Sequence, residues 1–367
     1  MNVVKKLATR WFIDAFTGMA QGLFCTLIAG TILAQIAGWI GDNFFGNTLG
    51  AIASVAKTLM GAGIGIGIAY SLKANKLAVF SAGVAGFAGA FSDKFLAGNY
   101  TIAFGAPGNP IGAYVVALLA VEIVSLYAGK TKLDIILIPL GTLLLSFAGF
   151  YLAYPFVWLI GKLGVLIAKA TAITPFFMGV VISVIMGILL TMPTSSAAIW
   201  VSVASPVVAG YAAGSVTASE YNAMLLAGGA AVVGCSCHMI GFAVSSFREN
   251  GVSGLISQGI GTSMLQIPNI MKKPVIMIPE ILASAILGPL STCLFHLKCN
   301  VAGGGMGTSG LVGVFGAIEA SSDLSPAILA LAVALLLFIL PAAISFGFSE
   351  LFRKIGWIAE GDQKLDK

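Results

Sequence analysis

Charged residues are scarce in this sequence. Its 19 lysines and arginines and 14 aspartates and glutamates make up only 9% of 367 residues, whereas 58% are hydrophobic. An ordinary soluble domain carries about 25% charged residues. So few charges cannot cover a water-exposed surface, which excludes a soluble enzyme, a nucleic-acid-binding domain and a disordered chain. The long apolar runs do not alternate with polar residues, so an outer-membrane barrel is also excluded. The composition predicts an all-α polytopic membrane protein.

Nucleotide and metal motifs are missing too. The sequence has no P-loop and no Rossmann fingerprint, which excludes an ATP-driven pump and a dinucleotide-binding domain. The cysteines are odd in number, lie in or beside apolar stretches and lack zinc spacing, so they favour reduced, packed thiols. We therefore expect no cofactor, no metal ion and no nucleic acid partner. The cysteines are Cys25, Cys235, Cys237, Cys293 and Cys299.

Apolar runs predict the membrane spans, since a span needs about 20 apolar residues. Two further runs, Leu77–Phe91 and Ala197–Ala213, are short and ambiguous, and together the runs predict about ten membrane elements. The clear candidates are Met19–Ile40, Ile52–Leu72, Ile111–Ala128, Ile135–Ile160, Phe176–Met192, Ala223–Phe247, Val275–Phe295 and Pro326–Phe348.

Basic residues predict the orientation, because cytoplasmic loops are rich in lysine and arginine. Residues 1–18 form an amphipathic N-terminal arm with Lys5, Lys6 and Arg10, and residues 349–367 form a tail with Arg353 and Lys354. Both ends are therefore expected to be cytoplasmic. Three basic turns are assigned to the same side: Lys73/Lys76, Lys130/Lys132 and Lys272/Lys273.

Glycine is abundant, at 46 residues, and two glycine-rich segments repeat the same pattern. Gly259–Leu265 and Gly305–Leu311 each contain Gly-x-Gly-Thr-Ser or its close equivalent. Non-helical backbone is tolerated at membrane depth only where it is buried in protein or lines a wet cavity. The pattern favours two re-entrant hairpins, near residues 252–269 and 300–318, that face a polar solute. The alternative is a pair of glycine-mediated helix contacts.

Hydroxyl and amide side chains around these segments are the candidate solute contacts. Amides both donate and accept hydrogen bonds, which suits a sugar-like solute. Glu319 lies in an apolar segment ten residues beyond Ser309, and His238 lies in the apolar run before the first segment, although a helix-packing role is the simpler interpretation of that histidine. The candidates are Thr262, Ser263, Gln266, Asn269, Thr308, Ser309, Glu319 and His238.

Other polar residues in apolar surroundings have simpler explanations. Arg248, Glu249 and Asn250 could form the cytoplasmic mouth of a pathway or an interfacial salt bridge. Glu280 begins a span, where a helix dipole would stabilise it, and Glu122 is expected to be structural. Pro193–Ser196 and Gln266–Asn269 are further polar breaks.

The same residues carry a family resemblance. Arg248–Gly251, Gly261–Asn269, Gly288–Thr292 and Gly305–Gly313, supported by Thr131–Ile136, are similar to the stand-alone EIIC-type membrane proteins of the bacterial phosphotransferase system. That family includes membrane regulators of the perfringolysin-O-regulator type. The sugar-transporting members carry an Asn/Thr-Glu-Pro hairpin motif, whereas this sequence contains no Glu-Pro pair.

The resemblance implies an EIIC glucose-superfamily-like fold in a bacterial inner membrane. Residues 19–172 would be the scaffold and homodimer surface, and residues 173–348 a moving transport half that binds a sugar between its hairpins. A separate cytoplasmic IIB protein would phosphorylate the sugar, because this chain carries no phosphoryl-accepting residue of its own.

Three functions follow from these observations. The first is a sugar permease component of the phosphotransferase type, translocating its solute by alternating access. The second is a membrane sensor or regulator that keeps the fold without coupled phosphorylation. The third is a facilitator or ion-coupled carrier outside that system.

Overall fold

The computed structural model describes residues 6–7, 9–192 and 196–365, so the polar break expected at residues 193–195 lies outside the described residues. The chain forms two compact units, Met1–Leu163 and Gly164–Lys367. The division falls inside one long helix rather than at the expected 172/173 boundary. Helices and turns, with no strand, make up the described parts of both units, which confirms the all-α prediction.

The first unit begins with a helical run from Arg10 to Ile40 that continues straight through residue 18, where the N-terminal arm was expected to end. This run contains α2 (Ala15–Leu23) and α3 (Ala29–Ile40), joined by the π-helical turn η2 (Phe24–Ile28). The following helices are α4 (Phe44–Thr58), α5 (Met60–Ser71), α6 (Lys76–Ala90), α7 (Ser92–Leu96), α8 (Pro110–Ser125) and α9 (Asp134–Ile173).

The second unit consists of helices that are shorter and more often interrupted. They are α10 (Pro175–Thr191), α11 (Ser196–Ala212), α12 (Ala218–Ser245), α13 (Phe247–Ile256), α14 (Ile267–Lys272), α15 (Ile278–Pro289), α16 (Val312–Ala320), α17 (Pro326–Ala334) and α18 (Leu340–Lys354). Residues 355–365 follow α18 as turns and irregular chain.

Capping residues set several helix starts. The Asn109 side chain accepts hydrogen bonds from the Ile111 and Gly112 amides, and Pro110 occupies the first position of α8. Thr217 and Glu220 form a capping box at the start of α12. These starts lie within a few residues of the apolar runs that predicted the helices.

Five helical segments in the described parts of the chain are long and apolar enough to cross a membrane, and a bent pair makes a sixth. The span expected at Ile52–Leu72 covers α5 and the second half of α4, and these two helices meet at a 53° bend. The span expected to end at Ile160 instead continues to Ile173 as a 40-residue helix containing Pro139 and Pro155. The five segments are Arg10–Ile40, Asp134–Ile173, Ala218–Ser245, Pro274–Phe295 and Pro326–Lys354.

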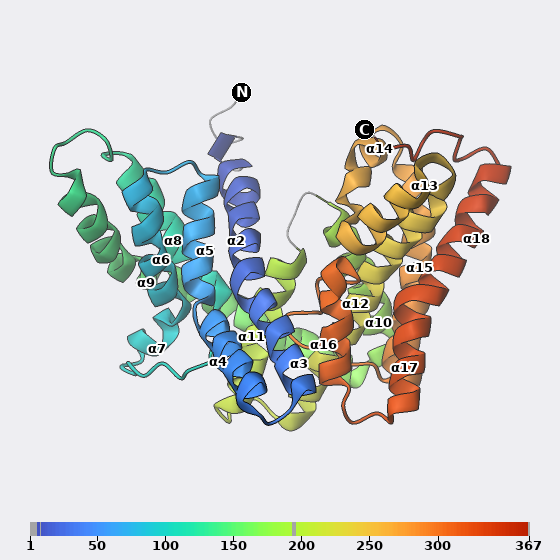
Figure 1. Cartoon of the computed structure of the whole chain (residues 1–367), viewed down its shortest axis with the longest axis horizontal. Helices are drawn as coiled ribbons and strands as arrows, with labels where there is room; N and C mark the ends of the chain where they lie inside the picture. Colours follow the sequence, from blue (N-terminus) through green and yellow to red (C-terminus); the bar gives the residue numbers. More distant parts are fainter. Residues whose placement is uncertain (1–5, 8, 193–195, 366–367) are drawn as a thin grey trace. The chain divides into compact units, whose positions relative to one another are not determined.

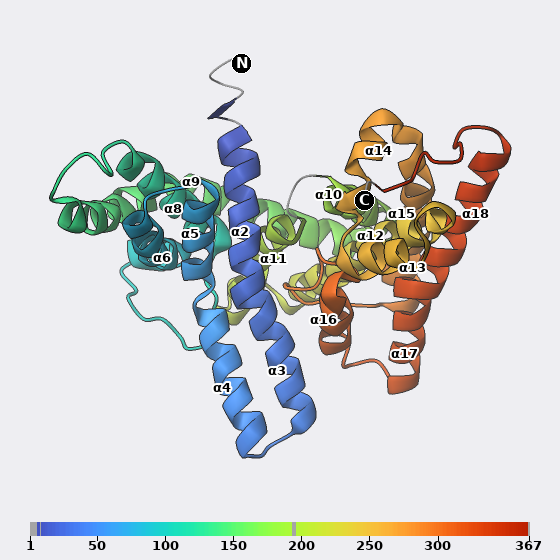
Figure 2. The same cartoon turned by 45° about the horizontal axis from the view of Figure 1, so that its top comes forward.

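Glycine contacts hold the first unit together. Along α5, alternate glycines point to opposite sides of the helix: Gly63 and Gly67 meet α2, whereas Gly61 and Gly65 meet α6. A Cβ atom on Gly65 would overlap the carbonyl oxygen of Ala82. Small residues let helix backbones approach this closely. Helices α2, α5, α6 and α8 consequently lie side by side (Figures 1 and 2).

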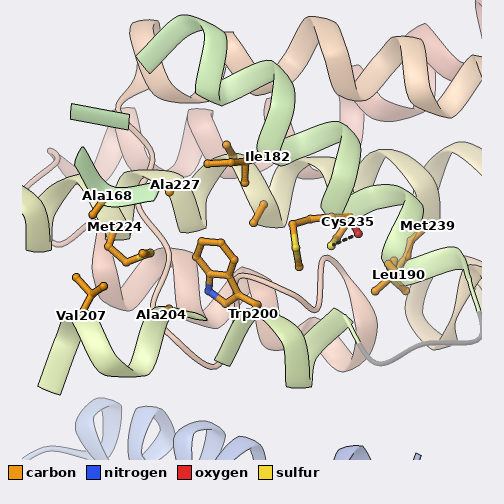
Figure 3. Close-up of a cluster of buried hydrophobic side chains, with 13 residues drawn as sticks. Ala168, Ile182, Leu190, Trp200, Ala204, Val207, Met224, Ala227, Cys235 and Met239 are labelled. Atoms are coloured by element: carbon orange, nitrogen blue, oxygen red, sulfur yellow. Dashed lines mark hydrogen bonds between the residues drawn. The ribbon is translucent and has the colours of Figure 1, made fainter. Parts of the chain in front are cut away.

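Helix α12 is the centre of the second unit and packs against α10, α15 and α18. In its most apolar window, 83% of the residues are buried inside the protein. One side of α12 joins a core around Trp200 and Ile182, and Cys235 donates a weak Sγ–H hydrogen bond to the Met186 carbonyl (Figure 3). The polar residues discussed below lie on and around this helix.

Candidate functional site

The two repeated glycine segments touch each other. The Thr308 hydroxyl donates to the Gly259 carbonyl at 2.6 Å, and the Ser309 hydroxyl donates to the Gly261 carbonyl at 2.9 Å. The structure therefore brings both repeats to one place. It also uses both hydroxyls of the second segment as hydrogen-bond donors to the backbone of the first.

Broken backbone produces this contact. Thr262 is extended (φ −161°, ψ 139°) between two short helical turns, and its hydroxyl caps the second turn by accepting from the Met264 amide. In the other segment, Gly307 and Gly310 have positive φ angles of 54° and 52°. Glycine adopts such angles without strain. A Cβ atom on Gly307 would also lie 2.8 Å from Cys235. Both the positive φ angle and this close contact therefore require glycine at position 307.

Ser263 connects the first segment to His238. Its hydroxyl lies 3.0 Å from the Thr191 hydroxyl, which lies 2.9 Å from Nδ1 of His238. All three residues are fully buried, and Nε2 of His238 has no hydrogen-bond partner. His238 is thus close to the first segment, as expected, but through Thr191, which the sequence analysis did not single out.

A network of amide side chains follows Ser263. Gln266 donates to Oε1 of Gln258 at 2.8 Å, and Asn269 donates to Oε1 of Gln266 at 2.8 Å. Gln258 in turn donates to the Ser246 hydroxyl at the end of α12. Gln258 and Gln266 are fully buried. The sequence analysis missed Gln258. Its amide side chain lies only eight residues before the predicted contact Gln266, and this proximity could have identified it as a candidate.

Residues Ala359–Leu365, here called the strap, fold back onto this network. The Gln363 carbonyl accepts from Gln266 at 2.9 Å and from Asn250 at 2.8 Å, and the Lys364 carbonyl accepts from Asn269 at 2.9 Å. The Gln363 residue is fully buried. The tail is therefore not a free segment: its backbone takes up the amide donors that were predicted to bind a solute.

Ion pairs tie the same segments together. Arg353 of α18 donates to Glu249 at 2.9 Å, and Glu249 is only 4% exposed. Arg353 also donates to the Gln363 side chain at 3.0 Å. Arg248 pairs with Glu350 at 3.0 Å but is largely exposed. Arg248, Glu249 and Asn250 were expected to form either the mouth of a pathway or a salt bridge. The structure contains ion pairs of Arg248 and Glu249, and Glu249 and Asn250 also contact the strap.

A cavity of about 710 Å³ opens between the first segment and the strap. Polar lining comes from Glu249, Asn250 and Asn269, apolar lining from Met264, and Lys364 and Leu365 of the strap contribute one wall. Concave sites of about 300–1,000 Å³ are typical of small-molecule binding. Two of the three predicted mouth residues, Glu249 and Asn250, thus share a single cavity with the predicted contact residue Asn269.

Glu319 is not part of this group. Its carboxylate is exposed and accepts from Asn300 at 2.6 Å. Helix α16 begins only at Val312, and the seven residues from there to Glu319 rise about 10 Å away from the broken backbone at Gly310. Proximity in sequence to Ser309 therefore does not place Glu319 near the repeated segments.

Acid should release the strap through one of its ion pairs. The Lys273 ammonium donates to Asp362 at 2.6 Å. Desolvation opposes the charged carboxylate, but hydrogen bonds from Lys273 and the Ala359 amide outweigh it, so the pKa of Asp362 lies below its usual value. The resulting stabilisation is present above the pKa of the unfolded chain and is lost as pH falls through the folded value, below about 4.

The Leu365 amide of the strap donates to Oδ1 of Asn250 at 2.8 Å. We therefore expect hydrogen exchange at this amide to gain an acid-induced acceleration beyond its intrinsic pH dependence. The Asp362→Asn variant should lack this acceleration, whereas the matched Asp323→Asn variant, which loses an ion pair with Lys298 elsewhere in the unit, should keep it. Identical profiles for the parent and Asp362→Asn would contradict the assignment.

These features define a polytopic helical membrane protein whose second unit gathers broken helices around a polar cavity. The chain belongs to the phosphotransferase system EIIC family, because the sequence model of that family matches residues 13–365. Searches of curated proteins and of solved structures give no match.

Proposed function

We propose that this protein is the sugar-binding permease component of a phosphoenolpyruvate-dependent phosphotransferase system. The observation that carries the proposal is the amide network of Gln258, Gln266 and Asn269 beside the 710 Å³ cavity. Amides donate and accept together, as sugar hydroxyls require. Asn250, Gln266 and Asn269 would contact the sugar, and Ser263 and His238 would support the wall behind them.

The strap must leave before the sugar can bind in this way. Its carbonyls occupy the same Gln266, Asn269 and Asn250 donors that the sugar needs. The described arrangement would be a closed state, and sugar binding would compete with the strap. Contacts between the Thr308 and Ser309 hydroxyls and the first segment would keep the two segments together during this exchange.

Translocation would follow by alternating access of the second unit, with phosphorylation by a separate IIB protein. A homodimer formed through the first unit is part of the proposal because the family resemblance implies it. Cross-links confined to the second unit would count against that assembly.

A sensor or regulator is the second candidate. Its support is the closed strap together with the missing Glu-Pro motif: the amide donors are already satisfied, so a ligand could act by displacing the strap without being transported. Uptake in proteoliposomes, supplied with the phosphorylated form of the cognate IIB protein as phosphoryl donor, separates the two candidates, since only a permease accumulates the phosphorylated sugar.

The binding proposal is tested by thermal unfolding of the purified full chain against a panel of sugars and sugar acids. A ligand that binds only the folded state raises the unfolding temperature. Asn269→Ala should weaken that ligand roughly threefold to tenfold, as expected for one lost hydrogen bond. Asn222→Ala, which removes an exposed amide that donates to the Ala218 carbonyl within α12, is the matched control. Equal affinities in both variants would remove Asn269 from the site.

The basic residues support a topology with both termini in the cytoplasm. Within the first unit, Arg10 reaches the Leu72 carbonyl, next to Lys73. Within the second unit, Lys273 pairs with Asp362 of the strap. Each unit thus places one basic turn beside its terminal segment. A reporter fused after Lys367 should be active only if it works in the cytoplasm, and activity restricted to the outside would reverse the assignment.

A further inference from the structure

Unpartnered polar oxygen atoms gather between α12, α15 and α18. Glu280, in the first turn of α15, is fully buried, and its Oε1 accepts from the Ser245 hydroxyl of α12 at 3.1 Å. Its Oε2 has no hydrogen-bond partner. The hydroxyls of Ser345 and Ser349 on α18 are also fully buried and without partners. Buried polar atoms are rarely left unsatisfied, so this group calls for an occupant.

Gly241 of α12 makes the space that these side chains share. A Cβ atom there would lie 2.6 Å from the Ser345 hydroxyl and 2.8 Å from Cγ of Glu280. The two side chains therefore approach the same point on α12 from different helices. Ser349 lies one turn beyond Ser345 on the same face of α18.

The positive and titratable groups nearby are already committed. Arg353 of α18 is engaged with Glu249 and with the Ser245 carbonyl. Helix α12 presents Cys237, and His238 of the same helix points its Nδ1 at Thr191. Helix α10 contains no ionisable side chain. Among the described residues Glu280 has no ion-pair partner, and an unpaired carboxylate inside an apolar span is strongly unfavourable.

We infer that Glu280, Ser245, Ser345 and Ser349 form a binding site for a single small monovalent cation. One carboxylate supplies one negative charge, which a monovalent ion neutralises and a divalent ion would overcompensate. Carboxylate and hydroxyl oxygens suit a hard cation, either sodium or a proton. The site is distinct from the proposed sugar cavity, but Ser245 joins them, because Gln363 of the strap reaches the same hydroxyl at 3.4 Å.

Thermal unfolding of the full chain at constant ionic strength tests the site. Sodium chloride should raise the unfolding temperature of the parent saturably, on the order of 2 °C above potassium or choline chloride. Glu280→Gln should abolish the sodium effect, and Ser345→Ala should shift it to at least about threefold higher sodium. Glu319→Gln, which removes an exposed carboxylate elsewhere in the unit, should respond as the parent does.

A proton in place of sodium gives a different pattern that also supports the site. The parent would then ignore sodium, its unfolding temperature would fall with rising pH more steeply than that of Glu280→Gln, and the parent would show a carboxylic-acid band in the infrared that the variant lacks. Identical sodium and pH responses in the parent, Glu280→Gln and Ser345→Ala would overturn the proposal. If Glu280→Gln does not fold, the Ser345→Ala comparison and the infrared band of the parent decide the outcome. No sugar is needed, so this result is independent of the proposed permease function.

Discussion

Truncation after Ile358 is expected to raise the affinity for the cognate sugar on the order of tenfold. The strap supplies the carbonyls that occupy Gln266, Asn269 and Asn250, and it closes one wall of the cavity. Its hydrogen bonds each contribute about 0.5–1.5 kcal/mol, partly offset by the entropy of ordering the segment. If only a fraction of molecules is open, the apparent dissociation constant equals the intrinsic one divided by that fraction, and truncation removes this penalty.

Isothermal titration of the full and truncated chains measures this difference. The substitution Gln363→Ala is the milder version, because it keeps the strap backbone while removing the side chain that reaches Arg353 and Ser245. It should fall between the parent and the truncated chain. Glu360→Ala, at an exposed strap residue outside the cavity lining, should behave as the parent. A truncated chain that folds and binds with parental affinity would show that the strap does not compete with the sugar.

Replacing Gly65 with valine is expected to destabilise the first unit by about 3 kcal/mol or more. A Cβ atom there would overlap the Ala82 carbonyl oxygen, so α5 and α6 would have to separate along their contact. Overpacking typically costs about 1–3 kcal/mol, and backbone against backbone has less freedom to adjust than side chains do. Because α5 also contacts α2 through Gly63 and Gly67, the displacement would spread across three helices.

The control for this substitution is Gly38→Val. Gly38 lies in α3 with no atom close enough to meet an added Cβ, so the same chemical change should leave the unfolding temperature nearly unaltered. Both variants are compared by thermal unfolding and by monodispersity in detergent. Equal unfolding temperatures would mean that the glycine contacts contribute little to the packing of α5.

The apolar runs were sufficient to predict the helical membrane architecture, because long apolar segments have few other stable solutions in lipid. They were not sufficient to predict where a helix bends or stops. The break at Leu59 lies inside a run that remains apolar through Leu72, and α9 passes Pro139 and Pro155 without ending. The hydropathy of a segment reflects whether lipid or water surrounds it. A bend depends instead on neighbouring residues that hydrogen-bond the backbone groups left without helical partners.

The candidate site was only partly visible in the sequence. The repeated Gly-x-Gly-Thr-Ser motif identified two segments, because such glycines and hydroxyls are unusual in an apolar chain. The two segments do contact each other in the structure. The strap gave no such signal. Residues 359–365 have the polar composition of an ordinary solvated tail, and Gln363 meets Gln266 across 97 positions of sequence. Contacts of that range depend on the whole fold.

Helix α12 has to suit two environments at different times. In the finished protein its neighbours α15 and α18 cover it, so an interior helix could carry many more polar groups than it does. Those neighbours follow it in the chain, however, and are synthesised later. Until they arrive, only α10 and other earlier helices can cover α12, and the rest of its surface must remain in lipid, which the mean hydropathy of 1.7 in its most apolar window permits. The apolar character of α12 is thus set by the order of synthesis, and substitutions that add polarity to it should reduce membrane insertion before they affect the folded protein.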